Sequence, residues 1–71
     1  MKICNNLKLW RIKSGDLTQD ELAQRTGCSR QTINSIEKGK FNPSIELALK
    51  LADILLCNVG ELFYLEKDDE K

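Results

Sequence analysis

Residues 19–37 read QDELAQRTGCSRQTINSIE, a pattern of two short amphipathic helices joined at Gly27. Thr18 and Glu21 form a capping box before the first helix, because the threonine hydroxyl accepts from the Glu21 amide and the carboxylate reaches back. Ser29 is a suitable cap for the second helix. Gly27 supplies the left-handed backbone that a sharp turn between helices favours. We therefore predict helices over residues 19–25 and 30–38.

The rest of the chain is also typical of helices, since its apolar residues recur at three- and four-residue spacing. Asn5 or Asn6 can cap one helix, Ser44 caps another after the turn at Pro43, and Asn58 begins a short last one. These signals predict helices over residues 6–13, 45–55 and 59–64, with an acidic tail at 66–71. The expected fold class is all-α: a compact five-helix bundle in which residues 1–71 form a single helix-turn-helix domain.

Two apolar features carry expectations about the core. Residues 45–55 are apolar except for one narrow polar stripe, so this helix should be the buried spine of the bundle. Trp10 lies in register with Leu7 and is expected to be a core anchor. With 71 residues the chain is small, and its stability must come from efficient packing of few side chains.

The formal net charge is zero, with eleven basic and eleven acidic residues, but the charges are unevenly distributed. Residues 1–40 hold eight basic and four acidic side chains, and residues 41–71 hold three and seven, so the halves carry +4 and −4. A zero net charge on its face argues against nucleic acid as a partner. The segment 19–37 nevertheless lies in the positive half, where such a partner fits.

Several function classes find no support in the residue types. The three cysteines, Cys4, Cys28 and Cys57, are far apart in the sequence and fit neither a disulfide framework nor a metal site. We interpret them as reduced, small apolar residues of a cytoplasmic protein. No histidine, phosphate loop or nucleophile motif is present, so we expect no enzyme, cofactor, small-molecule substrate or membrane span.

The exposed face of the helix over residues 30–38 is unusual for a solvated helix. Ile33 and Ile36 mark its core side, and the opposite side carries Gln31, Asn34, Ser35 and Lys38. Arg30 lies at one edge and Thr32 nearer the core. Arginine can donate to guanine O6 and N7, an amide can pair with adenine N6 and N7, and short side chains such as Thr32 and Ser35 can contact a thymine methyl group or a base edge.

The motifs on which a family resemblance depends are Thr18-Gln19, Glu21-Leu22-Ala23, Gly27, Ser29-Arg30-Gln31-Thr32-Ile33, Ile36-Glu37-Lys38-Gly39-Lys40 and Asn42-Pro43-Ser44. Together they resemble the phage repressor and Cro type of helix-turn-helix transcriptional regulators, the xenobiotic-response-element-like family. The resemblance covers residues 7–65 and is closest to short, stand-alone members. Leu56 departs from it, because the family usually has a helix-ending glycine there, and Gly60 replaces a helix former.

The resemblance implies a role for each matching residue. Gln19 would anchor to a phosphate and brace the first side chain of the reading helix. The residues that match DNA base-reading positions are Arg30, Gln31 and Ser35, to which we add Thr32. The expected DNA backbone contacts are Gln19, Ser29, Asn34, Lys38 and Lys40. Arg11 and Glu37 match a structural pair that ties residues 6–13 to the end of the reading helix.

We therefore expect sequence-specific binding of double-stranded DNA by a small repressor, with the helix over residues 30–38 in the major groove. One domain of this size offers one half-site, so a homodimer is expected, with the last helix and the exposed side of residues 45–55 as its interface. The alternative is a protein-interaction module, such as an antitoxin or coactivator, built on the same fold. Its surface would use exposed apolar residues, which include Leu9, Ile12, Phe41, Leu49, Leu56, Phe63 and Tyr64.

Overall fold

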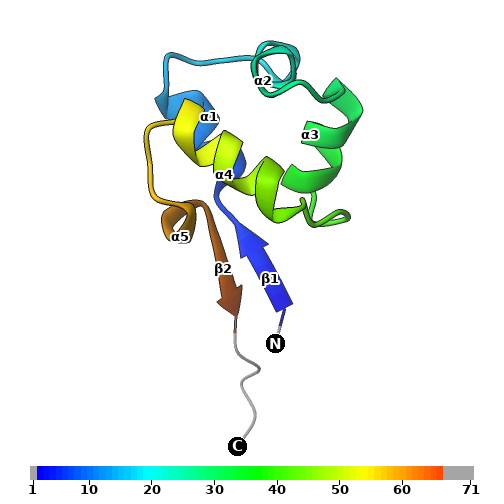
Figure 1. The fold of residues 1–71 in the computed structure, drawn as a ribbon, viewed down its shortest axis with the longest axis vertical. Coiled ribbons are helices and arrows are strands. Elements are labelled where there is room, and N and C mark those ends of the chain that lie inside the picture. The colour runs from blue at the N-terminus through cyan, green and yellow to red at the C-terminus, as the bar shows by residue number, and fades with distance from the viewer. Residues whose placement is uncertain (1, 67–71) are drawn as a thin grey trace, which may run out of the picture.

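The computed structural model describes residues 2–66, which form five helices and two short strands (Figure 1). In chain order the elements are β1 (Lys2–Asn5), α1 (Leu7–Lys13), α2 (Gln19–Thr26), α3 (Arg30–Glu37), α4 (Ile45–Ile54), α5 (Val59–Leu62) and β2 (Phe63–Glu66). In Figure 1, α4 crosses the middle of the molecule, α2 and α3 lie at one end, and the strands extend from the other. A helix is thus present at each of the five predicted places.

The all-α prediction is wrong in one respect, because the two ends of the described chain pair as an antiparallel sheet. Ile3 pairs with Leu65 and Cys4 with Tyr64. The last helix accordingly ends at Leu62, not Tyr64, and Glu66 belongs to a strand, not to a tail. The remainder of the predicted acidic tail, residues 67–71, lies outside the described residues. Strands of four residues that pair across some sixty others leave no local pattern from which to predict them.

The core is formed by ten buried apolar residues, namely Leu7, Leu17, Leu22, Ala23, Ile33, Ile36, Leu51, Ala52, Leu55 and Leu62. The expectation for residues 45–55 is only half met, since Leu51 and Ala52 are buried whereas Ile45 is 80% exposed. An eleven-residue apolar segment in so small a domain has too few neighbours to cover all its sides. Trp10 packs against the core but is only partly buried, and the Lys13 ammonium lies 4.9 Å from the centroid of its ring.

The helices start where their capping side chains stand. The Thr18 hydroxyl accepts from the Glu21 amide at 3.0 Å, and the Thr18 amide donates to the Glu21 carboxylate at 2.8 Å. Ser29 and Ser44 accept in the same way from the third residue of α3 and of α4. At α1 it is Asn5, not Asn6, whose side chain accepts from the helix, at 3.1 Å from the Leu7 amide.

Three helices end in a pair of backbone hydrogen bonds around a left-handed residue; the pairs after α3 and α4 have the same pattern, whereas after α2 both amides donate to the Ala23 carbonyl. After α3, the Gly39 amide donates to the Ile36 carbonyl and the Lys40 amide to the Ser35 carbonyl, with a φ of +75° at Gly39. After α2, Gly27 occupies the equivalent position. After α4, Leu56 does so with a φ of +56° and an exposed fraction of 87%. A leucine in this conformation is strained, because its Cβ approaches the backbone.

The cysteines of the described chain, Cys4, Cys28 and Cys57, are free and half-buried. Burial raises the pKa of the Cys57 thiol, and the Glu61 carboxylate raises it further. Burial and the neighbouring Glu66 carboxylate likewise raise the pKa of Cys4. Within residues 2–66 no three potential ligands gather into a metal site, and none of the helices combines the length and the apolarity that crossing a membrane requires.

Candidate nucleic-acid interface

The turn between α2 and α3 is held by backbone and side-chain hydrogen bonds. The amides of Gly27 and Cys28 both donate to the Ala23 carbonyl, at 2.9 and 3.0 Å. Thr26 is buried, and its hydroxyl lies 2.9 Å from the Leu22 carbonyl oxygen and 3.2 Å from the Cys28 sulfur. With its donors and acceptors paired in this way, the turn fixes the angle at which α3 leaves α2.

A nearly buried ion pair anchors the far end of α3. The Arg11 guanidinium donates to both Glu37 carboxylate oxygens, at 2.7 Å from Nε and 3.2 Å from Nη2, and a third nitrogen donates to the Leu17 carbonyl at 2.6 Å. The side chains of Arg11 and Glu37 are 11% and 6% exposed. This two-pronged geometry connects α1, the loop before α2 and the end of α3, and it gives α3 a fixed position.

Gln19 extends this network from the first turn of α2, but not as the resemblance implied. Its amide nitrogen donates to the Glu37 carboxylate at 3.0 Å and lies 3.3 Å from the Asn34 side-chain oxygen. Gln19 therefore braces the second half of α3, and no hydrogen bond joins it to Arg30 at the helix start. The Glu37 carboxylate, held in place by Arg11, is a charged acceptor within reach of the Gln19 amide nitrogen, and hydrogen bonds to charged acceptors are the stronger ones.

Asn5 is a positioning residue, whereas the sequence indicates only a possible helix cap at this position. Its side-chain nitrogen donates to the Ile36 carbonyl at 2.8 Å, so that β1 also holds the C-terminal end of α3. Nothing near Asn5 in the sequence indicates this contact, because the two residues are 31 positions apart. Three segments of the chain thus bond directly to one short helix, through Asn5, Arg11 and Gln19, and the loop carbonyl of Leu17 holds Arg11 in place.

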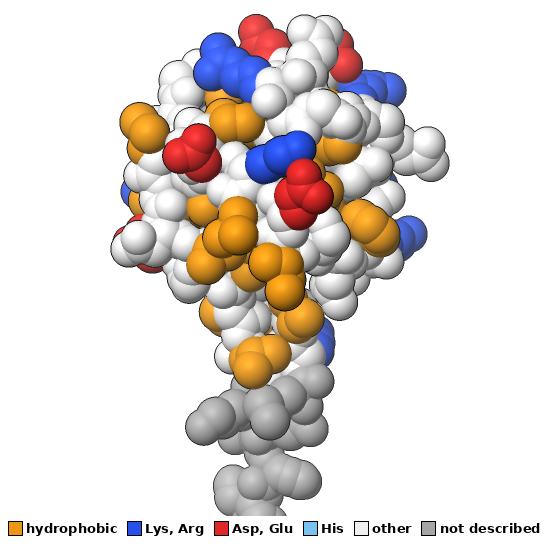
Figure 2. Space-filling model, viewed as in Figure 1, with side chains coloured by type: hydrophobic (Ala, Val, Ile, Leu, Met, Phe, Trp, Pro, Cys, Tyr) orange, Lys and Arg blue, Asp and Glu red, His pale blue; other side chains and the backbone are white. Residues whose placement is uncertain are grey.

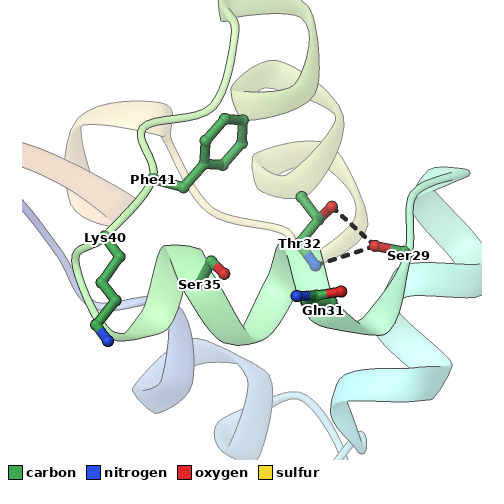
Figure 3. A pocket seen from close by; sticks show the side chains of 6 residues that line it. All are labelled: Ser29, Gln31, Thr32, Ser35, Lys40 and Phe41. Atoms are coloured by element: carbon green, nitrogen blue, oxygen red, sulfur yellow. Dashed lines mark hydrogen bonds between the residues drawn. The ribbon is translucent and has the colours of Figure 1, made fainter.

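The opposite face of α3 borders a shallow hollow of about 250 Å³. Figure 3 shows its side chains, which come from the cap, the body and the end of α3 and from the loop after it. The residues that line it are Ser29, Gln31, Thr32, Ser35, Lys40 and Phe41. Five of these six are sequence-predicted DNA contacts, and the structure brings them together on one surface. The sixth, Phe41, is expected from the sequence only as part of a protein-binding surface.

The other predicted contacts lie beside this hollow or behind it. Arg30 and Lys38 are exposed at the two ends of α3, and Asn34 is half-buried against Gln19. Within the hollow the Thr32 and Ser29 hydroxyls lie 2.9 Å apart. The only acidic side chain of α3, Glu37, is held on the inner side by Arg11. The outward face therefore combines cations, amides and hydroxyls without a competing carboxylate of its own helix.

Such a surface suits the major groove of DNA in charge and in hydrogen bonding. Cations neutralise phosphates, and the N-terminus of α3 adds partial positive charge near Ser29. Amides and hydroxyls both donate and accept, as base edges require. A short helix that projects from a rigid turn is the element that a helix-turn-helix inserts into DNA. The class of protein that this fold and face define is a helix-turn-helix DNA-binding domain.

Comparison with known proteins agrees with this class. The sequence profile of the helix-turn-helix family, of the Cro/C1 type, matches residues 7–62, and the chain belongs to this family. An uncharacterised HTH-type transcriptional regulator of Methanocaldococcus jannaschii is 45% identical over 65 residues, which are 92% of this chain and 97% of the relative. A second, YgzD of Bacillus subtilis, is 35% identical, again over 92% of this chain and 97% of its own.

Two solved structures share the fold. A protein of Bacteroides fragilis described as a candidate for DNA binding superposes with a TM-score of 0.78 at 26% identity, over 86% of this chain and 97% of its own. The restriction-modification controller protein C.AhdI of Aeromonas hydrophila has a TM-score of 0.71 at 34% identity, over 78% of each chain. The resemblance drawn from the sequence motifs is thereby confirmed.

Proposed function

We propose that this protein is a transcriptional regulator that binds double-stranded DNA sequence-specifically, with α3 in the major groove and α2 across the phosphate backbone. The observation that carries the proposal is the set of polar and basic side chains on the outer face of α3, whose inner face is fixed by the Arg11–Glu37 pair. Its HTH-type relatives, which are named transcriptional regulators, support the regulatory role.

Base reading falls to side chains on the outer face of α3. Arg30 and Gln31 are exposed at its N-terminal end, which enters deepest into the groove in this class of domain. Ser35 lies one turn further on, and Thr32 lies between them. Arg30 suits guanine, because its two donors match O6 and N7, and the Gln31 amide suits adenine.

Backbone contacts fall to residues at the rim of this surface. Ser29, Lys38 and Lys40 are exposed at the start and end of α3, where phosphates would pass. Asn34 keeps its amide nitrogen as a donor, because its oxygen lies on Gln19. The Gln19 side chain donates inward to Glu37 and Asn34, so the contribution of this position to phosphate binding would come from the N-terminal amides of α2.

Regulation would follow from occupancy of the site. A protein bound across a promoter excludes other proteins from the same DNA, and we therefore propose repression. The level of occupancy would follow the concentration of the protein or its assembly state.

We further propose a homodimer that places two copies of α3 on half-sites about one helical turn apart. The supporting observation is an apolar stripe on the exposed side of α4, made of Ile45, Leu49 and the following Leu56, with exposed fractions of 80%, 53% and 87%. Figure 2 looks onto α4 and shows hydrophobic side chains that gather from this helix down to the strands. Contact of these side chains with a second copy of the protein would remove apolar surface from water.

The oligomer is tested by light scattering at micromolar concentration, with and without DNA. We expect a dimer for the natural chain and a monomer for Leu49→Glu, because a carboxylate in the stripe would have to be desolvated. Leu9→Glu is the matched control, since Leu9 is 54% exposed on α1, outside the stripe. A natural chain that is monomeric under both conditions would reject the dimer.

The DNA-binding proposal is tested by selecting bound duplexes from a random pool and then measuring two variants on the enriched sequence. Arg30→Ala should cost about 1–3 kcal/mol of binding free energy and relax the preference at one base pair. Lys40→Ala should weaken binding to all sequences alike and reduce the slope of log affinity against log salt by about one. Failure to enrich any sequence would refute the proposal in favour of a protein-interaction module.

A further inference from the structure

Phe41 is an aromatic side chain that neither the core nor the polar reading face explains. It is 47% exposed, and it is not among the partly buried hydrophobic residues that pack against the core. It forms one wall of the hollow on the outer face of α3. In Figure 3 its ring lies on the same side of α3 as the Thr32 side chain, while Lys40 extends away from both. An exposed phenylalanine beside amides and hydroxyls offers an apolar contact to a ligand that binds this face.

The backbone holds this ring in place relative to α3. The double hydrogen bond at the end of α3 fixes Lys40, whose amide donates to the Ser35 carbonyl at 2.9 Å, and Phe41 is the next residue. Pro43, two residues later, restricts the backbone on the other side. The ring is therefore presented with α3, and a ligand that contacts Gln31 or Ser35 also lies close to the ring.

The hollow combines an apolar side with a polar one. The Phe41 ring and the Thr32 methyl group form the apolar side, and Gln31, Ser29 and Ser35 supply amide and hydroxyl groups. In the major groove of DNA only one base pair edge carries an apolar group, the C5-methyl of thymine, which protrudes beside hydrogen-bonding atoms. A base stacked flat on the ring would need single-stranded DNA, which a rigid helix-turn-helix face does not require.

We infer that Phe41 is a specificity-determining residue that selects a thymine by contact with its methyl group, in the hollow shared with Thr32. This inference rests on the proposed binding of α3 in the major groove. It adds a preference for one base that is set by a residue outside α3. The thymine lies beside the base pairs that Gln31 and Thr32 contact, because these side chains line the same hollow as Phe41. The preference is expected even where no hydrogen bond to that base is made.

The test changes the DNA before it changes the protein. In the enriched duplex each thymine is replaced in turn by deoxyuridine, which keeps the hydrogen-bonding pattern and lacks only the methyl group. The dissociation constant of each duplex is measured by fluorescence anisotropy. For the natural chain we expect one position in each half-site at which uracil weakens binding about three- to fivefold, the effect of one methyl-sized group removed from water.

Protein variants then assign that position to the ring. Phe41→Ala should bind the thymine duplex about three- to fivefold more weakly and should no longer distinguish thymine from uracil at this position. Phe41→Leu, which stays apolar, should keep part of the distinction. Leu9→Ala is the matched control, because Leu9 is similarly exposed but lies on α1, and it should retain the full distinction.

Each contrary outcome has one meaning. An enriched sequence without a methyl-sensitive thymine overturns the inference and leaves the proposed function intact, and this result needs no variant that must fold. A thymine preference that persists in Phe41→Ala assigns it to other residues and likewise overturns the inference. Equal weakening of enriched and random DNA by Phe41→Ala shows a backbone contact instead. Enrichment of no sequence overturns both proposals.

Discussion

The α2–α3 unit and the half formed by α4, α5 and the sheet differ in the residues that end their helices and in the residues that cover their outer faces. Both halves end a helix in a left-handed residue, but α2 and α3 use Gly27 and Gly39 whereas α4 uses the strained Leu56. The outer face of α3 is polar, whereas the outer side of α4 exposes Ile45 and Leu49. The difference teaches that the inner side of α3 is fixed by paired polar side chains, whereas the outer side of α4 leaves apolar side chains exposed, for which we propose a second copy as the partner.

The fixed position of α3 depends most on the Arg11–Glu37 pair, so Glu37→Ala should have the largest effect. The substitution leaves the Arg11 guanidinium, 11% exposed, without its carboxylate. Loss of one partner from a buried pair typically costs about 3–5 kcal/mol, which in so small a domain lowers the melting temperature by more than about 10 °C. Circular dichroism during heating measures this change.

The control for this prediction is Glu46→Ala, which removes the 3.3 Å ion pair of Glu46 with Lys50 on the exposed side of α4. Because both side chains are more than half exposed, that change should cost no more than about 0.5 kcal/mol. An unchanged melt for Glu37→Ala would remove the basis on which we contrast the two halves.

The two halves are joined at Asn5, and its removal should have an intermediate effect. Asn5→Ala loses the bond to the Ile36 carbonyl at 2.8 Å and the bond from the Leu7 amide at 3.1 Å. We expect a loss of about 1–2 kcal/mol in the free energy of unfolding, measured in urea. Asn6→Ala should cost less, because its bond to the Glu61 carbonyl is exposed. Equal losses would show that α3 does not depend on β1.

The smallest expected effect is a gain. Leu56→Gly removes the strain of a left-handed leucine, and the greater freedom of glycine in the unfolded chain offsets part of this gain. We therefore expect about 0.5–1 kcal/mol of added stability. Urea unfolding at a concentration where the protein is monomeric measures it. If Leu56 serves the dimer, the same variant should dimerise only at higher concentration. A loss of stability in the monomer would show that the leucine already has a partner there.

The sequence allowed prediction where the signals were local. The capping residues Thr18, Ser29 and Ser44, together with the glycines, located the helices, because each cap acts on an amide three residues away. The Arg11–Glu37 pair came only from the family resemblance, since its partners are 26 positions apart in the sequence.

The features that escaped prediction are long-range. The sheet pairs residues at opposite ends of the described chain, and Asn5 contacts a carbonyl on α3. The Gln19 side chain forms its hydrogen bond with Glu37 and not with Arg30, and this depends on where the packed helices place the Glu37 carboxylate. As an apolar residue, Phe41 is predicted from the sequence only as part of a protein-binding surface. Its place in the hollow shows that it belongs to the same face as Gln31 and Ser35.

The pairing of β1 with β2 has a practical consequence. Because the strands are antiparallel and Lys2 lies opposite Glu66, both ends of the described chain emerge at one pole of the domain, away from α2 (Figure 1). A fluorophore, a surface linker or a fused reporter attached through either end would therefore leave from the same side. For binding measurements, the two labelling sites are interchangeable, and a pair of dyes placed there would report separation of the strands by energy transfer.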